Sequence, residues 1–180
     1  MEEIRIIPAN LDHVLTVTKL VKEFSIENRR DLPLKYTSES FVRDNLGSFK
    51  DPSKYFEFLL AVKINPLGID NINCLQYDKV IGCVMYNKTF TFDHGRFLTM
   101  HNLYVKKKHR KQGIGLSLIK AVMEIARREA GVIRFITNSD NPAIEWYQRL
   151  GATILFTDSR LKTTLTFEQI SINNLLKPAH

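Results

Sequence analysis

The chain has few of the residues that cross-link a small protein or bind a metal. Its 180 residues include two cysteines, Cys74 and Cys83, which share no motif and therefore predict reduced thiols rather than a disulfide framework. The five histidines show no ligand spacing such as HExxH, so we expect no metal. No apolar run approaches the length that spans a bilayer, and the first residues, MEEIRIIPAN, lack the apolar stretch of a secretory signal. These absences predict a cytoplasmic protein without a membrane segment.

What the chain does contain is an ordinary globular composition with an excess of positive charge. Hydrophobic residues make up 44% and charged residues 25%, which argues against a disordered or fibrous chain. At this length we expect a single domain over residues 1–180. The net charge of +7 favours anionic partners. Because no basic stripe interleaved with aromatic residues is present, an anionic cofactor is favoured over nucleic acid.

Periodicity and turn residues predict helices and strands around one sheet. Ile4–Ile7 is a short strand, and Asn10 is placed to cap an amphipathic helix from Leu11 to about Asn28. A loop at 65–78 and a turn at 93–95 separate the middle strands. The other predicted elements are a helix at 38–47, strands at 54–64, 79–92 and 96–105, a helix at 113–130, a strand at 132–137, a helix at 140–151, strands at 152–157 and 161–167, and a helical tail from Glu168. This order indicates a mixed α/β fold.

The densest positive charge directly precedes the helix predicted from Gly113. Residues Lys106–Lys111 read KKKHRK, and QGIG follows. The N–H groups of a first helical turn have no intrahelical partner, and glycine lets a ligand approach the backbone, so this stretch suits a phosphate. It does not fit GxxxxGK[ST], and Leu118 stands where the dinucleotide pattern GxGxxG needs its third glycine. A solvated basic turn with a glycine cap is the alternative.

This stretch, together with a second one downstream, resembles the GNAT family of N-acetyltransferases. Residues 110–115 fit the family pattern [RQ]xxGx[GA], and residues 140–151 fit a pattern close to NxxAxxFYxxxGF, except that Asp140 stands at its first position. The matching residues are Arg110, Gly113, Gly115, Ala143, Trp146, Tyr147 and Gly151. The chain looks most like the polyamine (spermidine/spermine-type) and thialysine acetyltransferase branch. The resemblance implies a central mixed sheet of six to seven strands with flanking helices.

Acetyl-CoA is the cosubstrate that the resemblance implies. The pyrophosphate would bind at the loop and helix start, the pantetheine arm would pair with the backbone of Leu103–Val105, and the acetyl group would lie in the V-shaped opening between the fourth and fifth strands, near Val132–Thr137. The residues that the resemblance assigns to the cofactor are Leu103, Tyr104, Val105, Arg110, Lys111, Gln112, Gly113, Ile114, Gly115, Leu116, Asp140, Asn141, Ala143 and Tyr147.

Acetyl transfer to an amine needs a neutral amine, a polarised thioester and a proton for the leaving thiolate. Tyr147 matches the family tyrosine that protonates the thiolate, so the resemblance implies direct attack in a ternary complex with Tyr147 as the acid. His101 stands where the polyamine-type enzymes have an acidic pair, and it is the candidate base. The alternatives are that Tyr147 only packs a short helix and that His101 is hydrogen-bonded structure.

The acceptor is the least specified part of the prediction. Glu27, Asn102, Arg134 and Phe135 are assigned to it, while Glu23, Asp31 and Glu57 are further acidic candidates that are more often solvated surface groups. The function predicted is transfer of acetyl to a primary amine of a polyamine- or thialysine-like small molecule. A protein amine, an aminoglycoside-like amine and a coenzyme A-binding module with little turnover stay open. Related enzymes are often dimers, which makes a homodimer the expected assembly if one forms.

Overall fold

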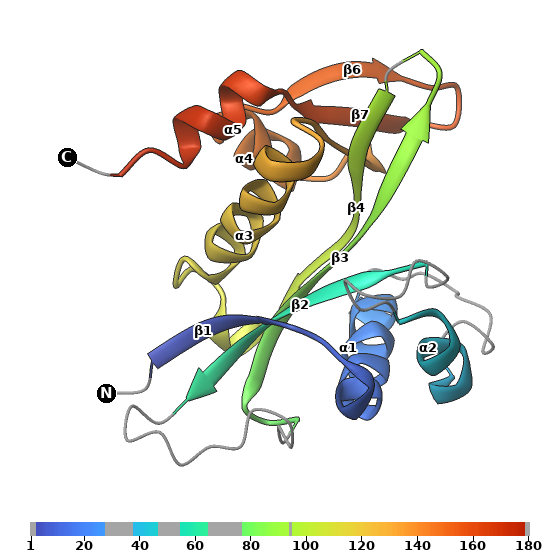
Figure 1. Ribbon diagram of the computed structural model, residues 1–180, viewed down its shortest axis with the longest axis vertical. Coiled ribbons are helices and arrows are strands. Elements are labelled where there is room, and N and C mark those ends of the chain that lie inside the picture. Colours follow the sequence, from blue (N-terminus) through green and yellow to red (C-terminus); the bar gives the residue numbers. More distant parts are fainter. Residues whose placement is uncertain (1–2, 28–37, 47–54, 65–76, 94, 179–180) are drawn as a thin grey trace. The chain divides into compact units, whose positions relative to one another are not determined.

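The computed structural model describes residues 3–27, 38–46, 55–64, 77–93 and 95–178 (Figure 1). By their internal contacts they form two compact units, Met1–Met85 with Asn102–Leu118, and Tyr86–His101 with Ile119–His180. Strands β3 (Val80–Thr91) and β4 (Gly95–Val105) and helix α3 (Ile114–Glu129) contribute residues to both units. A single domain over residues 1–180 stays a prediction.

The described strands form one seven-stranded sheet in the order β1-β2-β3-β4-β5-β7-β6, which confirms the predicted mixed α/β fold. The other strands are β1 (Glu3–Pro8), β2 (Glu57–Ile64), β5 (Ile133–Asn138), β6 (Thr153–Thr157) and β7 (Lys162–Phe167). Pairing is antiparallel in β1–β2, β5–β7 and β6–β7, and parallel in β4–β5. The β4–β5 register joins Leu98 to Ile133 and Thr99 to Arg134. Strand β4 extends beyond this register to Val105, and β5 extends to Asn138.

In the first unit, α1 (Val14–Glu27) and α2 (Glu39–Asn45) lie side by side. The chain enters α1 through a 3₁₀ turn, η1 (Leu11–His13), where the predicted cap is confirmed: the Asn10 side chain accepts from the Asp12 N–H, and the His13 ring accepts from the Asn10 N–H. Apolar residues of α1 at helical spacing are buried against β2, β3 and β4. The cluster includes Val17, Leu20, Phe24, Leu60, Val62, Val80 and Tyr104.

In the second unit, the later part of α3 supplies buried side chains at helical spacing, together with strands β5 and β7. The largest are Ile119, Met123, Ile133, Leu165 and Phe167, all less than 2% exposed. Gly131 follows the end of α3, and its φ of +75° lets its N–H bond to the Ala126 carbonyl at 2.6 Å. Helices α4 (Ala143–Arg149) and α5 (Gln169–Leu175) complete the unit. No helix among the described residues is long and apolar enough to cross a membrane.

Most element boundaries agree with the sequence pattern within a few residues, and three differences bear on the site. Lys107–His109 form a 3₁₀ turn, η4, which the sequence pattern did not predict. Helix α3 begins at Ile114, one residue later than predicted. Helix α4 begins at Ala143, so Pro142 precedes its first turn rather than lying within it. The predicted loop at 65–78 and the helix end at Gly47 fall largely outside the described residues.

Candidate active site

The loop between β4 and α3 belongs wholly to the first unit. The Lys106 N–H bonds to the Ile81 carbonyl at 2.9 Å, which ties the end of β4 to β3, and η4 follows. Lys111 and Gly113 have φ values of +60° and +77°, and these two left-handed residues turn the chain into α3. A Cβ at Gly113 would meet nothing within 4 Å, so glycine is required there by the backbone conformation.

The start of α3 presents the amide donors that a phosphate needs. The first bond of the helix runs from the Ser117 N–H to the Gly113 carbonyl at 3.0 Å. The N–H groups of Ile114, Gly115 and Leu116 therefore precede the helical hydrogen-bond pattern. The Gln112 side chain donates back to the Lys108 carbonyl at 3.4 Å. With a 16-residue helix behind it, this turn carries positive potential as well as donors, so the residues present fit a pyrophosphate.

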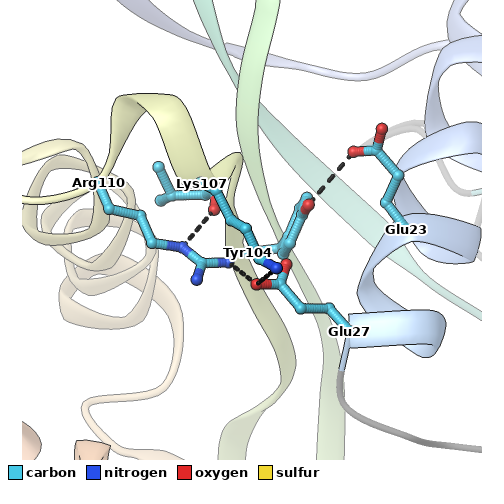
Figure 2. A network of polar contacts seen from close by, with 6 residues as sticks. Glu23, Glu27, Tyr104, Lys107 and Arg110 are labelled. Atoms are coloured by element: carbon cyan, nitrogen blue, oxygen red, sulfur yellow. Dashed lines mark hydrogen bonds and ion pairs between the residues drawn. The ribbon is translucent and has the colours of Figure 1, made fainter.

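Arg110 is held in place by two contacts (Figure 2). Its Nε donates to the Val105 carbonyl at 2.9 Å, and its Nη2 lies 2.6 Å from Oε1 of Glu27, at the end of α1. The Lys107 ammonium lies 3.8 Å from the same oxygen. Since a guanidinium has five N–H donors, two contacts leave Arg110 further donors for a ligand. Glu27, which the sequence assigned to the acceptor, bridges two cations of the loop, and its contact with an acceptor stays a prediction.

A second set of polar groups lies beside this one. The Tyr104 hydroxyl donates to Oε2 of Glu23 at 3.2 Å, and the Lys106 ammonium donates to the Tyr77 carbonyl at 2.8 Å. Burial, and then the Glu23 carboxylate, hold the pKa values of Tyr77 and Tyr104 above their usual range. Burial lowers the pKa of Lys106, which Glu23 opposes. A cavity of about 560 Å³ lies here, and its lining includes these residues and Glu27.

Cys83 is buried in the core of the first unit and is not a nucleophile. Burial raises the pKa of its thiol to about 12, so it stays protonated at neutral pH. Cys74 lies outside the described residues.

In the second unit, Tyr147 on α4 is 9% exposed and packs between aromatic rings. Its ring centroid lies 4.6 Å from that of Phe135 and 5.0 Å from that of Trp146. Burial raises the pKa of the phenol to about 12, above the ordinary value on which its predicted role as an acid was based. In this surrounding Tyr147 holds its proton firmly and is suited to donate a hydrogen bond.

The turn before α4 uses Asn141 for its own structure. Its Oδ1 accepts from the Ala143 N–H at 2.9 Å, which caps the helix, and its Nδ2 donates to the Thr137 hydroxyl at 2.5 Å. Asp140 is exposed and Ala143 is half-buried. The side chain of Asn141 is thus a scaffold of α4, and contact between these three residues and a cofactor stays a prediction.

His101 on β4 bonds across to β3. Its Nε2 lies 2.5 Å from Oδ1 of Asn87, and desolvation lowers the pKa of the imidazole below its usual range. Of the remaining acceptor candidates, Asn102 is half-buried on β4, Arg134 stacks its guanidinium 4.8 Å over the ring of Phe97, and Phe135 is 4% exposed in the core. Asp31 lies outside the described residues, and Glu57 begins β2.

The sequence pattern did not predict three contributors to these arrangements: Asn87, and the partnerships Glu23–Tyr104 and Glu27–Arg110. The last two join residues 81 and 83 positions apart. Sequence patterns over a few neighbouring residues do not indicate contacts between residues so far apart in the chain. The polar residues Asn87 and Thr89 alternating on a predicted strand were the one local signal, because they mark a polar face next to His101.

Comparison with known proteins agrees with the fold and the loop. Residues 32–152 match the model of the acetyltransferase (GNAT) family, and the match spans both motifs. The chain is 24% identical over 139 residues to the thialysine N-epsilon-acetyltransferase of Sus scrofa, covering 76% of each chain. It is 25% identical over 162 residues to the Mus musculus enzyme of that name, covering 88% of this chain and 89% of the other.

Among solved structures, the PaiA N-acetyltransferase from Thermoplasma acidophilum in complex with coenzyme A has a TM-score of 0.68 at 13% identity, covering 92% of this chain and 99% of that one. That likeness concerns the fold. The chain belongs to the GNAT acetyltransferase family, and it is an acetyl-CoA-dependent N-acetyltransferase.

Proposed function

We propose that this enzyme acetylates a primary amine of a small thialysine- or polyamine-like molecule. The observation that carries the proposal is that the curated relatives that match it are named thialysine N-epsilon-acetyltransferase, with matches over 76% to 88% of the chain. At about 25% identity the acceptor pocket is free to differ, so the amine itself is the part that experiment must supply.

For the cofactor, we propose that the amides of Ile114, Gly115 and Leu116 and the remaining donors of Arg110 hold the pyrophosphate. Leu103–Val105 would offer their backbone to the pantetheine arm. Acetyl-CoA supplies the activated thioester. The support is the open, left-handed Gly113 and the unpaired first turn of α3, which place donors where no Cβ intervenes.

In the proposed chemistry the amine nitrogen forms a bond to the acetyl carbon as the carbon–sulfur bond breaks. His101, whose lowered pKa keeps it neutral near pH 7, takes a proton from the attacking amine directly or through water. The Tyr147 hydroxyl donates a hydrogen bond to the departing thiolate, and the one proton that the neutral amine loses passes from His101 through solvent to that thiolate. A phenol of pKa about 12 is less acidic than an ordinary thiol near ~8.5, so donation without full transfer is the contribution expected of Tyr147 in this surrounding.

The test is release of coenzyme A in the presence of purified protein, acetyl-CoA and a panel of amines. The panel contains thialysine, lysine, spermidine, an aminoglycoside and lysine-containing peptides. Turnover on the first three at kcat/KM at least tenfold above the others supports the proposal. A preference for peptides or for the aminoglycoside would contradict the proposed acceptor and would assign a protein amine or an aminoglycoside-like amine in its place. Thermal stabilisation by acetyl-CoA without turnover on any amine would indicate a coenzyme A-binding module.

We further propose that the protein is a cytoplasmic homodimer. The edge strand β6 supports the assembly, because all five of its residues are exposed, including Ile154, Leu155 and Phe156.

A cytoplasmic location fits a buried reduced thiol at Cys83 and a supply of acetyl-CoA.

A further inference from the structure

A polar ladder joins β3 and β4 within the second unit. The hydroxyls of Thr89 and Thr99 lie 2.7 Å apart, and two residues further along, Asn87 Oδ1 lies 2.5 Å from His101 Nε2. These two contacts pair residues on antiparallel strands, so both belong to one face of the sheet. The ladder therefore places a neutral amide against the candidate base.

The orientation of the Asn87 amide follows from its other contacts. Its second terminal atom lies 3.3 Å from the Lys88 carbonyl and 3.3 Å from the Thr89 hydroxyl. A backbone carbonyl only accepts hydrogen bonds, so the amide atom beside it must be the NH₂ group. The atom that faces His101 is consequently the carbonyl oxygen, which can only accept.

We infer that Asn87 is a positioning residue that fixes the tautomer of His101. Because Oδ1 of Asn87 accepts, Nε2 of His101 carries the hydrogen, and the lone pair of the neutral ring resides on Nδ1. Nδ1 is then the nitrogen that takes the proton, and the Nε2–H bond to Asn87 persists in both protonation states. The inference deepens the proposed function, on which its catalytic meaning rests.

Two charged side chains on the strands next to β4 make their contacts with other residues. On β3 the Lys88 ammonium pairs with Glu129 at 2.7 Å, and on β5 Arg134 stacks over Phe97. Desolvation is the cause that lowers the pKa of His101. A neutral partner such as Asn87 orients the ring and leaves this low pKa in place, whereas a carboxylate at the same position would raise it by about 1–2 units.

Nitrogen-15 NMR of the full-length protein, with or without acetyl-CoA, tests the tautomer directly. Long-range proton–nitrogen correlations distinguish a ring nitrogen with a lone pair from one that carries hydrogen. Above the pKa we expect the lone pair on Nδ1 and the hydrogen on Nε2. A Nδ1–H tautomer overturns the inference, whatever the activity. If the Nε2–H tautomer is observed but no amine is turned over, the role of His101 as a base is contradicted, while the assignment of its tautomer stands.

The variant Asn87→Asp gives a second readout that structural damage would not mimic. In wild type, the pH profile of kcat/KM should fall on its acid side, the acid limb, with an apparent pKa below ~6.5. Asn87→Asp should raise the apparent pKa of this limb by about 1–2 pH units. Asn87→Ala, which adds no charge, should lower kcat/KM without an upward shift. Phe90→Asp adds the same charge at a neighbouring, 61% exposed position and should leave the limb within about 0.3 units. An unmoved limb in Asn87→Asp contradicts the inference.

Discussion

Desolvation shifts the pKa values of the two candidate proton carriers in opposite directions: Tyr147 is buried, whereas His101 is exposed by its surface area but partly desolvated at its ring. Desolvation raises the pKa of the phenol to about 12 and lowers that of the imidazole, so both side chains are neutral at physiological pH. A neutral phenol can donate and a neutral imidazole can accept. The surroundings of each residue therefore hold it in the protonation state that its proposed role requires.

The variant Tyr147→Phe tests whether the Tyr147 hydroxyl donates a hydrogen bond to the departing thiolate. The ring keeps its packing against Phe135, while the hydroxyl is lost, so kcat should fall about 10²- to 10⁴-fold and the Kd for acetyl-CoA should stay within about twofold. Steady-state kinetics and calorimetric titration measure the two quantities. Tyr86→Phe removes another buried phenol of the same unit, 0% exposed, and should leave kcat within a few fold. An unimpaired Tyr147→Phe enzyme would remove Tyr147 from the mechanism.

Gly82 on β3 lies so close to β4 that there is no room for a side chain. A Cβ there would lie 2.8 Å from the Tyr104 carbonyl oxygen and 3.3 Å from a methyl of Val105. The strand on which the pantetheine arm is proposed to pair thus needs the space that glycine leaves.

Gly82→Ala should therefore lower the free energy of unfolding by about 1–3 kcal/mol, because a backbone carbonyl has to move. Denaturant unfolding of the purified variant measures the change, and the Kd for acetyl-CoA should rise with it. Gly95→Ala is the comparison: its φ of +67° makes the substitution strained, but no atom lies within 4 Å of the new Cβ. Equal stability of Gly82→Ala and wild type would show that β3 and β4 have room to separate.

At the scale of elements, the end of α1 meets the loop that precedes α3. Glu27 is 81% buried at its side chain and contacts both Arg110 and Lys107, two of the cations next to the proposed pyrophosphate site. Its negative charge competes with phosphate for the same donors. We therefore expect helix α1 to reduce the affinity of the loop for anions while it orders Arg110.

Glu27→Gln separates these two effects, since the amide oxygen still accepts from Arg110 while the charge disappears. We expect the Kd for acetyl-CoA to fall about two- to fivefold at low salt, the scale of one partly exposed ion pair, with a smaller change at high salt. Glu124→Gln removes a carboxylate that pairs with Arg127 at the same 2.6 Å and should leave the Kd unchanged. A weaker complex in Glu27→Gln would mean that orientation of Arg110 outweighs the competition.

The elements themselves were largely predictable from sequence, and the contacts between them were not. The apolar spacing in α3 and the continuous apolar run of β2 are local patterns that can be read along the chain. The phosphate loop was equally local, because its charge and glycines are consecutive. Asn87 beside His101 and Glu27 beside Arg110 depend on strand register and helix placement, which the chain specifies only through its folded packing.

At the scale of the whole molecule, the feature that bears on the proposed assembly is the edge of the sheet formed by β6. Ile154, Leu155 and Phe156 are 45%, 44% and 59% exposed, and the register with β7 shifts between Ile154 and Phe156. An apolar edge strand in contact with water favours association. Antiparallel contact between two copies about Leu155 would set Ile154 against Phe156 twice, and Thr153 against Thr157 twice. Such a two-fold contact would cover the exposed apolar side chains of both edges, and it is the assembly that we propose.

Light scattering coupled to size exclusion tests this assembly at about 50 µM protein, a concentration chosen well above the nanomolar to micromolar range of stable interfaces. Wild type should have twice the 20.9 kDa mass of one chain. Phe156→Lys should be monomeric, because each lysine would place an unpaired charge against Ile154 of the other copy, at the apolar centre of the contact. Phe92→Lys alters a phenylalanine that is 99% exposed in the same unit and should remain dimeric, which separates the edge of the sheet from general surface hydrophobicity. Monomeric wild type, or a dimer that Phe156→Lys leaves intact, would show that β6 is not the interface.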